Sequence, residues 1–271
     1  MDEKKFKIAI TGANGFVGTN LRKFLSSKKI QTVSLARIKH KEFKYEKSVI
    51  FSDLASKNLV KKLSGCDALV HLIGSGAQTA DADYQSVNVD QTRKIIQLCK
   101  KAKIKKIVYI SGLGVSKSTT FGYFISKLKA EQQIIKSGLG YTIFRASYIV
   151  GKSDPLTKNL LKQAKRGYII IPGSGSYRLQ PISVDDVSKI ILCCISSKTL
   201  SNKIVDLVGP KTISFENFVK QFARGKRIKI KKTSLENAYS EALRNPKKAT
   251  YGLDDLNILL GDFTSSHKKL E

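Results

Sequence analysis

The sequence is poor in the residues that build metal sites and disulfide frameworks. Only four cysteines and three histidines occur among its 271 residues. The cysteines are Cys66, Cys99, Cys193 and Cys194, and the histidines are His40, His71 and His267. Neither set shows CxxC spacing or a cluster of metal ligands, so the sequence predicts no metal site. So few thiols fit a reducing compartment, with the cysteines buried and unpaired.

Long hydrophobic runs are also absent. No apolar stretch approaches the roughly 20 residues that a transmembrane helix needs. The segment that begins at Met1 is charged and does not lead into the apolar region of a signal peptide. We therefore expect a cytoplasmic protein with no membrane span.

Acidic residues are scarce. The 21 aspartates and glutamates stand against 49 lysines and arginines, which gives a formal net charge of +28. A field of this size attracts polyanions. The lysines are scattered over the whole length, however, and aromatic residues are not interleaved with them. A solvated basic surface is therefore the favoured interpretation, and a surface for nucleic acid or an anionic membrane is the alternative.

Residues 1–150 contain a regular alternation of short β-branched runs and longer amphipathic segments. This alternation predicts βαβ units around a parallel sheet, that is, a doubly wound Rossmann α/β domain. The expected strands are Phe6–Thr11, Thr32–Ala36, Ser48–Phe51, Ala68–Ile73, Lys106–Ser111 and Tyr141–Arg145. Apolar residues at helical spacing predict helices at Tyr84–Ala102 and Phe121–Lys136, which would pack on the sheet.

Proline and glycine punctuate shorter elements after residue 150. We expect residues 151–271 to form a smaller α+β lobe for the substrate, interleaved with the first domain. The expected helices are Lys158–Arg166, Asp185–Ser196, Ser214–Ala223 and Leu235–Arg244, and the expected strands are Tyr168–Ile171, Ile204–Val208 and Ile228–Ile230.

A glycine pattern stands directly between the first strand and a helix. The run from Thr11 to Gly18 contains Gly12, Gly15 and Gly18, with Asn14, Phe16 and Val17 between them. Gly12 allows a tight turn, Gly15 lets the backbone approach a pyrophosphate, and Gly18 lets the helix pack close to the strand. The sequence therefore predicts a dinucleotide site here, although three glycines can also serve only a tight turn.

The end of the second strand predicts which dinucleotide is preferred. An acidic residue at this position accepts from the ribose hydroxyl of NAD, and a basic one meets the 2′-phosphate of NADP. Here Arg37 follows the strand, Lys39 is close behind, and no carboxylate occurs before Glu42. We expect NADP(H) to be preferred over NAD(H), with Arg37 on the phosphate.

The GxxGxxG spacing resembles that of the short-chain dehydrogenase/reductase superfamily, in its extended or atypical branch. Further stretches between residue 6 and about residue 232 agree, including Gln180–Val187, which is similar to the segment that closes the family's substrate pocket. By resemblance, Asp53 and Leu54 would contact the adenine and Leu72, Ile73 and Gly74 would line the cofactor. The sequence departs from the family's pattern at Gln91, where glycine is usual, and at Ala146, where proline is usual.

Tyr123 and Lys127 form a YxxxK pair, and their i,i+4 spacing places them on one face of the expected helix. An ammonium beside a phenol stabilises the phenolate, so we expect Lys127 to lower the pKa of Tyr123. Ser111 ends the fifth strand and can donate to the same substrate oxygen. The resemblance further implies that Lys127 holds the nicotinamide ribose and that Asn88 organises a proton-relay water. The alternative is that Tyr123 only packs at a helix start.

Two functions remain open. The first is an NAD(P)-dependent oxidoreductase, or an enzyme similar to the NAD-dependent epimerases and dehydratases, with Arg166 and Arg178 available to a nucleotide-linked or other anionic substrate. The second is a non-catalytic NADP(H)-binding scaffold or assembly factor, with nucleic acid as a less favoured partner, because the chain is also similar to the complex I accessory subunit type. The helices that begin at Tyr84 and Phe121 could pair two copies into a homodimer.

Overall fold

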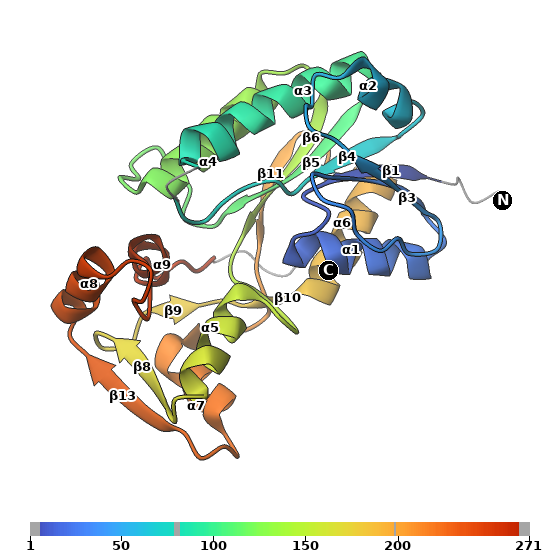
Figure 1. Cartoon of the computed structure of the whole chain (residues 1–271). Coiled ribbons are helices and arrows are strands. Elements are labelled where there is room, and N and C mark those ends of the chain that lie inside the picture. Colours follow the sequence, from blue (N-terminus) through green and yellow to red (C-terminus); the bar gives the residue numbers. More distant parts are fainter. Residues whose placement is uncertain (1–5, 79–81, 198, 266–271) are drawn as a thin grey trace.

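A seven-stranded parallel sheet is the centre of the larger part of the molecule (Figure 1). The computed structural model describes residues 6–78, 82–197 and 199–265. The strand order is β11-β6-β5-β4-β1-β2-β3, and every neighbouring pair is parallel. The strands are β1 (Lys7–Thr11), β2 (Gln31–Ala36), β3 (Glu46–Ile50), β4 (Ala68–His71), β5 (Lys106–Gly112), β6 (Gly140–Ala146) and β11 (Lys203–Leu207). The doubly wound Rossmann fold is confirmed.

Helices cover both faces of the sheet (Figure 1). On one face lie α2 (Lys57–Leu63), α3 (Gln91–Lys101) and α4 (Gly122–Ile135), and on the other lie α1 (Phe16–Ser27) and α6 (Val184–Ser196). Strand β1 shows how the sequence produces two layers. Ala9 packs in the core under α2, α3 and α4, whereas Ile8 and Ile10 pack in the core under α1 and α6. Side chains alternate along a strand, so one buried apolar run serves both faces.

The helix expected at Tyr84–Ala102 is not α-helical throughout. It begins as a π-helix, η1 (Gln85–Asp90), and becomes α-helical only at α3. Apolar spacing does not reveal such a segment, because a single π turn adds one residue without ending the helix. The turn carries Asn88, whose side chain is fully buried.

The rest of the chain forms a smaller lobe with its own core. Its main pair of strands is β8 (Tyr168–Pro172) beside β13 (Lys229–Thr233), and they run parallel. Its helices are α5 (Pro155–Ala164), α7 (Phe215–Ala223), α8 (Leu235–Arg244) and α9 (Leu253–Leu259). Two shorter pairs accompany the β8–β13 ribbon, namely β7 (Ile149–Val150) with β10 (Ile182–Ser183) and β9 (Arg178–Leu179) with β12 (Ile213–Ser214).

The chain after residue 150 is divided between the two parts. Helix α6 and strand β11 return to the large sheet, so the strand expected near Ile204 pairs with β6 and not with the lobe. Helix α5 begins three residues earlier than expected, at Pro155. The Asp154 carboxylate caps it by accepting from the Thr157 N–H at 2.8 Å, and proline suits the first helical position.

Two absences concern only the described ranges. No helix in them combines the length and apolar character needed to cross a bilayer, and no three potential metal-ligating side chains gather there. The cysteines are free; Cys66, Cys99 and Cys194 are buried, but Cys193 is exposed. His267 lies outside the described residues.

Candidate active site

The glycine turn brings β1 against β4 at the carboxyl edge of the sheet. Gly12 has φ +68°, and a Cβ there would lie 2.7 Å from the Leu72 carbonyl carbon. A Cβ on Gly18 would overlap the Gly12 carbonyl oxygen. Only glycine fits at either position, because one needs a left-handed backbone and the other a close helix approach. Helix α1 therefore begins beside a cavity, with Gly15 as its N-cap residue.

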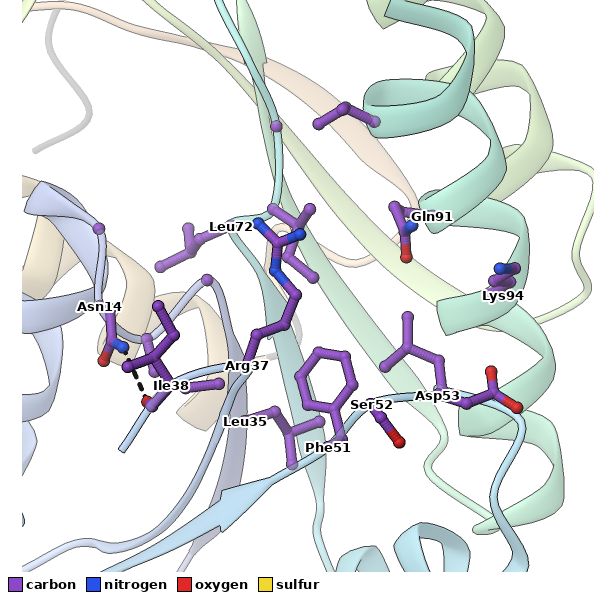
Figure 2. Close-up of a pocket in the computed structure, with 18 residues that line it drawn as sticks. Asn14, Leu35, Arg37, Ile38, Phe51, Ser52, Asp53, Leu72, Gln91 and Lys94 are labelled. Atoms are coloured by element: carbon purple, nitrogen blue, oxygen red, sulfur yellow. Dashed lines mark hydrogen bonds between the residues drawn. The ribbon is translucent and has the colours of Figure 1, made fainter. Parts of the chain in front are cut away.

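Two cavities meet at this turn, and Gly12, Gly15, Leu72 and Gly74 line both. The first, of about 460 Å³, lies beyond β1, β2 and β3 and is closed by α3 (Figure 2). The second, of about 590 Å³, lies between the sheet and the smaller lobe. Of the other predicted cofactor residues, Asn14, Arg37, Asp53, Leu54 and Ile73 line the first cavity, and Phe16, Val17 and Gly18 line the second.

The loop after β2 is attached to the glycine turn. The Asn14 side chain donates to the Ile38 carbonyl oxygen at 3.0 Å, and Arg37 extends over the first cavity from the adjacent position (Figure 2). Lys39 lies in neither cavity wall. Lys94, which the sequence analysis missed, lies opposite on α3 (Figure 2). Lys94 stands seven residues after Val87, which also lines this cavity, and residues at that spacing lie on the same face of a helix. This spacing is the sequence signal that could have predicted Lys94.

Ser111 and Tyr123 both line the second cavity. Ser111 is the residue before the last in β5, and its hydroxyl is buried without a hydrogen-bond partner among the described residues. A buried hydroxyl with no partner costs about 1–3 kcal/mol, so it is retained where a ligand supplies the partner. Tyr123 reaches the same cavity from the first turn of α4. The predicted pair is therefore brought together.

Lys127 stands behind this pair rather than in the cavity wall. Its ammonium donates to the Tyr109 hydroxyl at 3.2 Å and to the Ile110 carbonyl oxygen at 3.1 Å. Its Nζ lies 5.9 Å from the centre of the Tyr123 ring. Gly74 makes room for it, since a Cβ there would lie 3.0 Å from Nζ. Burial lowers the pKa of Lys127 to about 8.

The expectation that Lys127 lowers the pKa of Tyr123 is wrong for the protein without bound cofactor or substrate. Burial raises the pKa of the Tyr123 phenol to about 12. The physical reason lies in the geometry, because the ammonium is directed at Tyr109 and Ile110 and not at the phenol. Tyr123 is therefore a neutral proton donor at physiological pH.

Asn88 connects three elements. Its side-chain oxygen accepts from the Ser75 N–H at 2.9 Å, and its amide donates to the Ser75 carbonyl at 3.1 Å and to the Ser126 hydroxyl at 2.9 Å. Its own carbonyl accepts from the Thr92 hydroxyl at 2.7 Å. These bonds fix the loop after β4 and helix α4 against η1. Asn88 thus holds the backbone that surrounds Lys127.

His71 lies beneath the glycine turn, where its neutral imidazole ring connects neighbouring elements through hydrogen bonds. Its ring nitrogens bond to the Thr11 and Thr92 hydroxyls, each at 2.9 Å. Complete burial, together with the charge of Lys127, lowers the pKa of His71 to about 3. The imidazole therefore ties β1, β4 and α3 together without titrating near neutrality.

The wall contributed by the smaller lobe was not predicted. Tyr148, Tyr251, Asp255 and Ile258 line the second cavity, and the last two come from α9. The signals for α9 were present: apolar residues recur at Leu253, Leu256 and Leu259, and carboxylates occupy the first turn. Their position opposite Tyr123, more than 120 residues away in sequence, follows only from the fold.

The comparison with protein families decides the assignment. Residues 12–198 match the model of a family described as NAD(P)H-binding. The chain belongs to the NAD(P)H-binding family. With the fold, this match confirms the prediction of an atypical short-chain dehydrogenase/reductase that binds NAD(P).

Relatives of this NAD(P)H-binding protein carry different functional names. It is 25% identical to the uncharacterized sugar epimerase YhfK of Bacillus subtilis over 76% of this chain and 95% of that one. It is 22% identical to the mitochondrial NADH dehydrogenase [ubiquinone] 1 alpha subcomplex subunit 9 of Dictyostelium discoideum, over 80% and 63% of the two chains. The fold resembles that of MoeE5 in complex with UDP-glucuronic acid and NAD, with a TM-score of 0.73, 20% identity, and coverage of 84% and 85%.

Proposed function

We propose that this protein is an NADP(H)-dependent oxidoreductase that acts on a hydroxyl or carbonyl carbon in the second cavity. The observation that carries the proposal is the unpartnered, buried Ser111 hydroxyl beside Tyr123, next to the glycine turn. Two hydroxyl donors that converge on one cavity suit the oxygen of a carbonyl group. The glycine turn is a suitable site for the pyrophosphate of the cofactor.

Each residue has a distinct role in this proposal. The nicotinamide, when bound, supplies or accepts the hydride. Tyr123 holds the proton that goes to the carbonyl oxygen, and Ser111 donates a hydrogen bond to that oxygen. A phenol with a pKa of about 12 is a donor and not a base at neutral pH, which favours the reduction of a carbonyl. The charged Lys127 behind it stabilises the negative charge that develops.

NADP(H) is the proposed cofactor rather than NAD(H). Arg37 and Lys94 both line the first cavity, where the adenosine half would lie, and they supply two cations for a 2′-phosphate. The two glutamates nearest in sequence are engaged elsewhere. Glu42 accepts from the Ser48 N–H, and Glu46 forms a buried pair with Arg22. Neither is free to accept from a ribose hydroxyl.

The test is NADPH oxidation with a panel of ketones and aldehydes. Tyr123→Phe removes only the phenolic hydroxyl, so NADPH should still bind while turnover falls by about 100-fold or more. Tyr148→Phe removes a second phenol from the same cavity and should reduce kcat by much less. Equal rates for the wild type and Tyr123→Phe would refute the assignment of Tyr123.

A non-catalytic scaffold that binds NADP(H) is the second candidate. One observation favours it: the Lys127 ammonium is committed to Tyr109 and Ile110 rather than to the reacting phenol. Under this alternative NADPH binds, no carbonyl compound is reduced, and Tyr123→Phe changes no measured property. Retention on RNA or DNA that is steeply salt-dependent would add a polyanion partner for the +28 charge.

A further inference from the structure

The second cavity contains no cationic side chain in its described walls. Lysine and arginine make up 49 of the 271 residues, so a wall of 22 residues drawn from this chain would be expected to include several. It includes none. The adjoining cofactor cavity, by contrast, has Arg37 and Lys94 in its wall. The cationic wall residues of these two cavities thus lie on the cofactor side, and Lys127 stands behind the wall of the second cavity.

The two arginines expected to bind an anionic substrate do not face this cavity. Arg166 lies in neither wall, and Arg178 lines only a smaller adjoining cavity of about 180 Å³. The Arg178 guanidinium is already paired with both carboxylate oxygens of Asp262, at 2.7 Å to the nearer one. A paired guanidinium offers little to a second anion, because its best donors are occupied.

The backbone of the lobe offers no anion site either. Helix α5 begins at the cavity, and the N-terminus of a helix can bind an anion through its free N–H groups. Asp154 fills that place: its carboxylate accepts from Gly151 N–H at 3.1 Å and from Thr157 N–H at 2.8 Å. Its negative charge would repel a phosphate.

Asp255 adds a second carboxylate to the same wall. One of its oxygens accepts from the Gly252 N–H at 3.2 Å, and no lysine or arginine in the described ranges forms an ion pair with it. The residue is exposed at the cavity wall. The partial desolvation that it does undergo there, and then the charge of Asp254, raise the pKa of Asp255. Tyr148 and Tyr251 flank it in the cavity wall. A ligand group that donates hydrogen bonds would relieve this carboxylate, and an anion would aggravate it.

We propose that the substrate carries no phosphate or carboxylate and that it presents a hydrogen-bond donor, a hydroxyl or an ammonium group, to Asp255. This inference rests on the proposed function, because it names the class of compound that would be reduced beside Tyr123. The proposed substrate class therefore differs from the ligand of the structural neighbour MoeE5, which is in complex with UDP-glucuronic acid. Asp255 is then a specificity residue that faces the far end of the substrate.

The test uses three cyclic ketones of matched size: 4-hydroxycyclohexanone, 4-aminocyclohexanone and 4-oxocyclohexanecarboxylate. Their binding to the protein loaded with NADP⁺, which cannot supply a hydride to the ketone, is measured by calorimetry, so that the result does not depend on turnover. We expect the hydroxyl and ammonium ketones to bind at least tenfold more tightly than the carboxylate. Whichever of the hydroxyl ketone and the ammonium ketone binds more tightly shows whether Asp255 prefers a neutral hydrogen-bond donor or a cation. UDP-glucuronic acid should show no binding at 1 mM.

Asp255→Lys should reverse the order and favour the carboxylate ketone. Asp254→Asn is the neighbouring control: Asp254 accepts from the Gln78 N–H and does not line the cavity, and loss of its charge can only lower the pKa of Asp255 toward its ordinary value. It should keep the wild-type order. The inference would be overturned if the wild type bound the three ketones with equal affinity, or bound none of them. Micromolar binding of UDP-glucuronic acid by the wild type would also overturn it. Failure of the proposed function has a different signature, namely selective binding with no oxidation of NADPH.

Discussion

The Lys127 ammonium donates to the Tyr109 hydroxyl at 3.2 Å and lies 4.8 Å from the centre of the Tyr109 ring. Tyr109 is completely buried and also stacks on His71. This second phenol, together with the Ile110 carbonyl oxygen, therefore positions the lysine behind the active site. Tyr109 touches neither cavity, so it is a positioning residue.

The pH dependence of catalysis tests this arrangement. The pKa of Lys127 is about 8 and that of Tyr123 about 12, so the rate of carbonyl reduction should fall as pH rises through about 8, while Tyr123 stays protonated. Tyr109→Phe removes an acceptor from the ammonium and favours its neutral form. The fall should then move to lower pH by about 1 unit, as the loss of one hydrogen bond to a charged group implies. A purely structural role for Tyr109 would lower kcat without moving the pH profile.

The buried ammonium should also leave a signature in stability. Between about pH 8 and the ordinary value of 10.5, the folded state has released a proton that the unfolded state still holds. The unfolded state binds more protons in this window, so wild-type stability should rise with pH relative to Lys127→Met, by about 1.4 kcal/mol per pH unit. Urea unfolding at several pH values measures the difference. Lys129→Met, on the exposed side of the same helix, should track the wild type.

Arg22 joins the glycine turn to the loop that carries Arg37. Its guanidinium donates to the Ala13 carbonyl at 3.1 Å and the Lys41 carbonyl at 2.7 Å, and it pairs with Glu46. The pair is buried, so Arg22→Met deprives the Glu46 carboxylate of its guanidinium partner and should cost about 3–5 kcal/mol of unfolding free energy.

A surface ion pair is the control for that measurement. Lys189 and Asp186 are both more than half exposed, and Lys189→Met should change the unfolding free energy by less than about 1 kcal/mol. Similar losses for Arg22→Met and Lys189→Met would show that the buried pair does not hold these loops. NADPH affinity should fall with Arg22→Met alone.

Cofactor preference is tested by a matched pair of charge removals. Arg37→Ala takes a cation from the first cavity and should weaken NADPH binding by about tenfold or more, with little effect on NADH, because a charge-assisted bond to the 2′-phosphate is lost. Lys39→Ala removes the same charge two residues away, outside the cavity wall, and should leave both affinities nearly unchanged. Fluorescence titration of the wild type and of each variant with NADPH and with NADH gives the affinity of each variant for each cofactor relative to the wild type. Equal losses for the two cofactors would contradict the role of Arg37.

The sequence was sufficient for the glycine turn and for six of the seven strands of the sheet, because these follow from local rules, whereas β11 was expected in the smaller lobe. Gly12 and Gly18 need to be glycine for steric reasons, and β-branched runs of the right length become buried parallel strands. Regular spacing could not reveal the π turn at Asn88, which depends on contacts with Ser75 and Ser126. Tertiary packing decides such a turn.

The electrostatics of the site were the least predictable part. The pattern of Tyr123 and Lys127 indicated that the two face the same space, but the direction of the ammonium depends on Tyr109, a core residue of β5. Asp255 enters the cavity only because α9 packs on the lobe far along the chain. Burial then determines the pKa values, and burial is a property of the assembled fold.

The most direct measurement is a crystal structure of the protein with NADP⁺ bound. The account predicts the pyrophosphate over Gly12 and Gly15, the 2′-phosphate near Arg37, and the nicotinamide ring in the second cavity beside the Tyr123 hydroxyl. Space should remain for a carbonyl carbon about 3–3.5 Å from the carbon that donates the hydride. The dinucleotide bound elsewhere, or the phenol turned away from the nicotinamide, would contradict it.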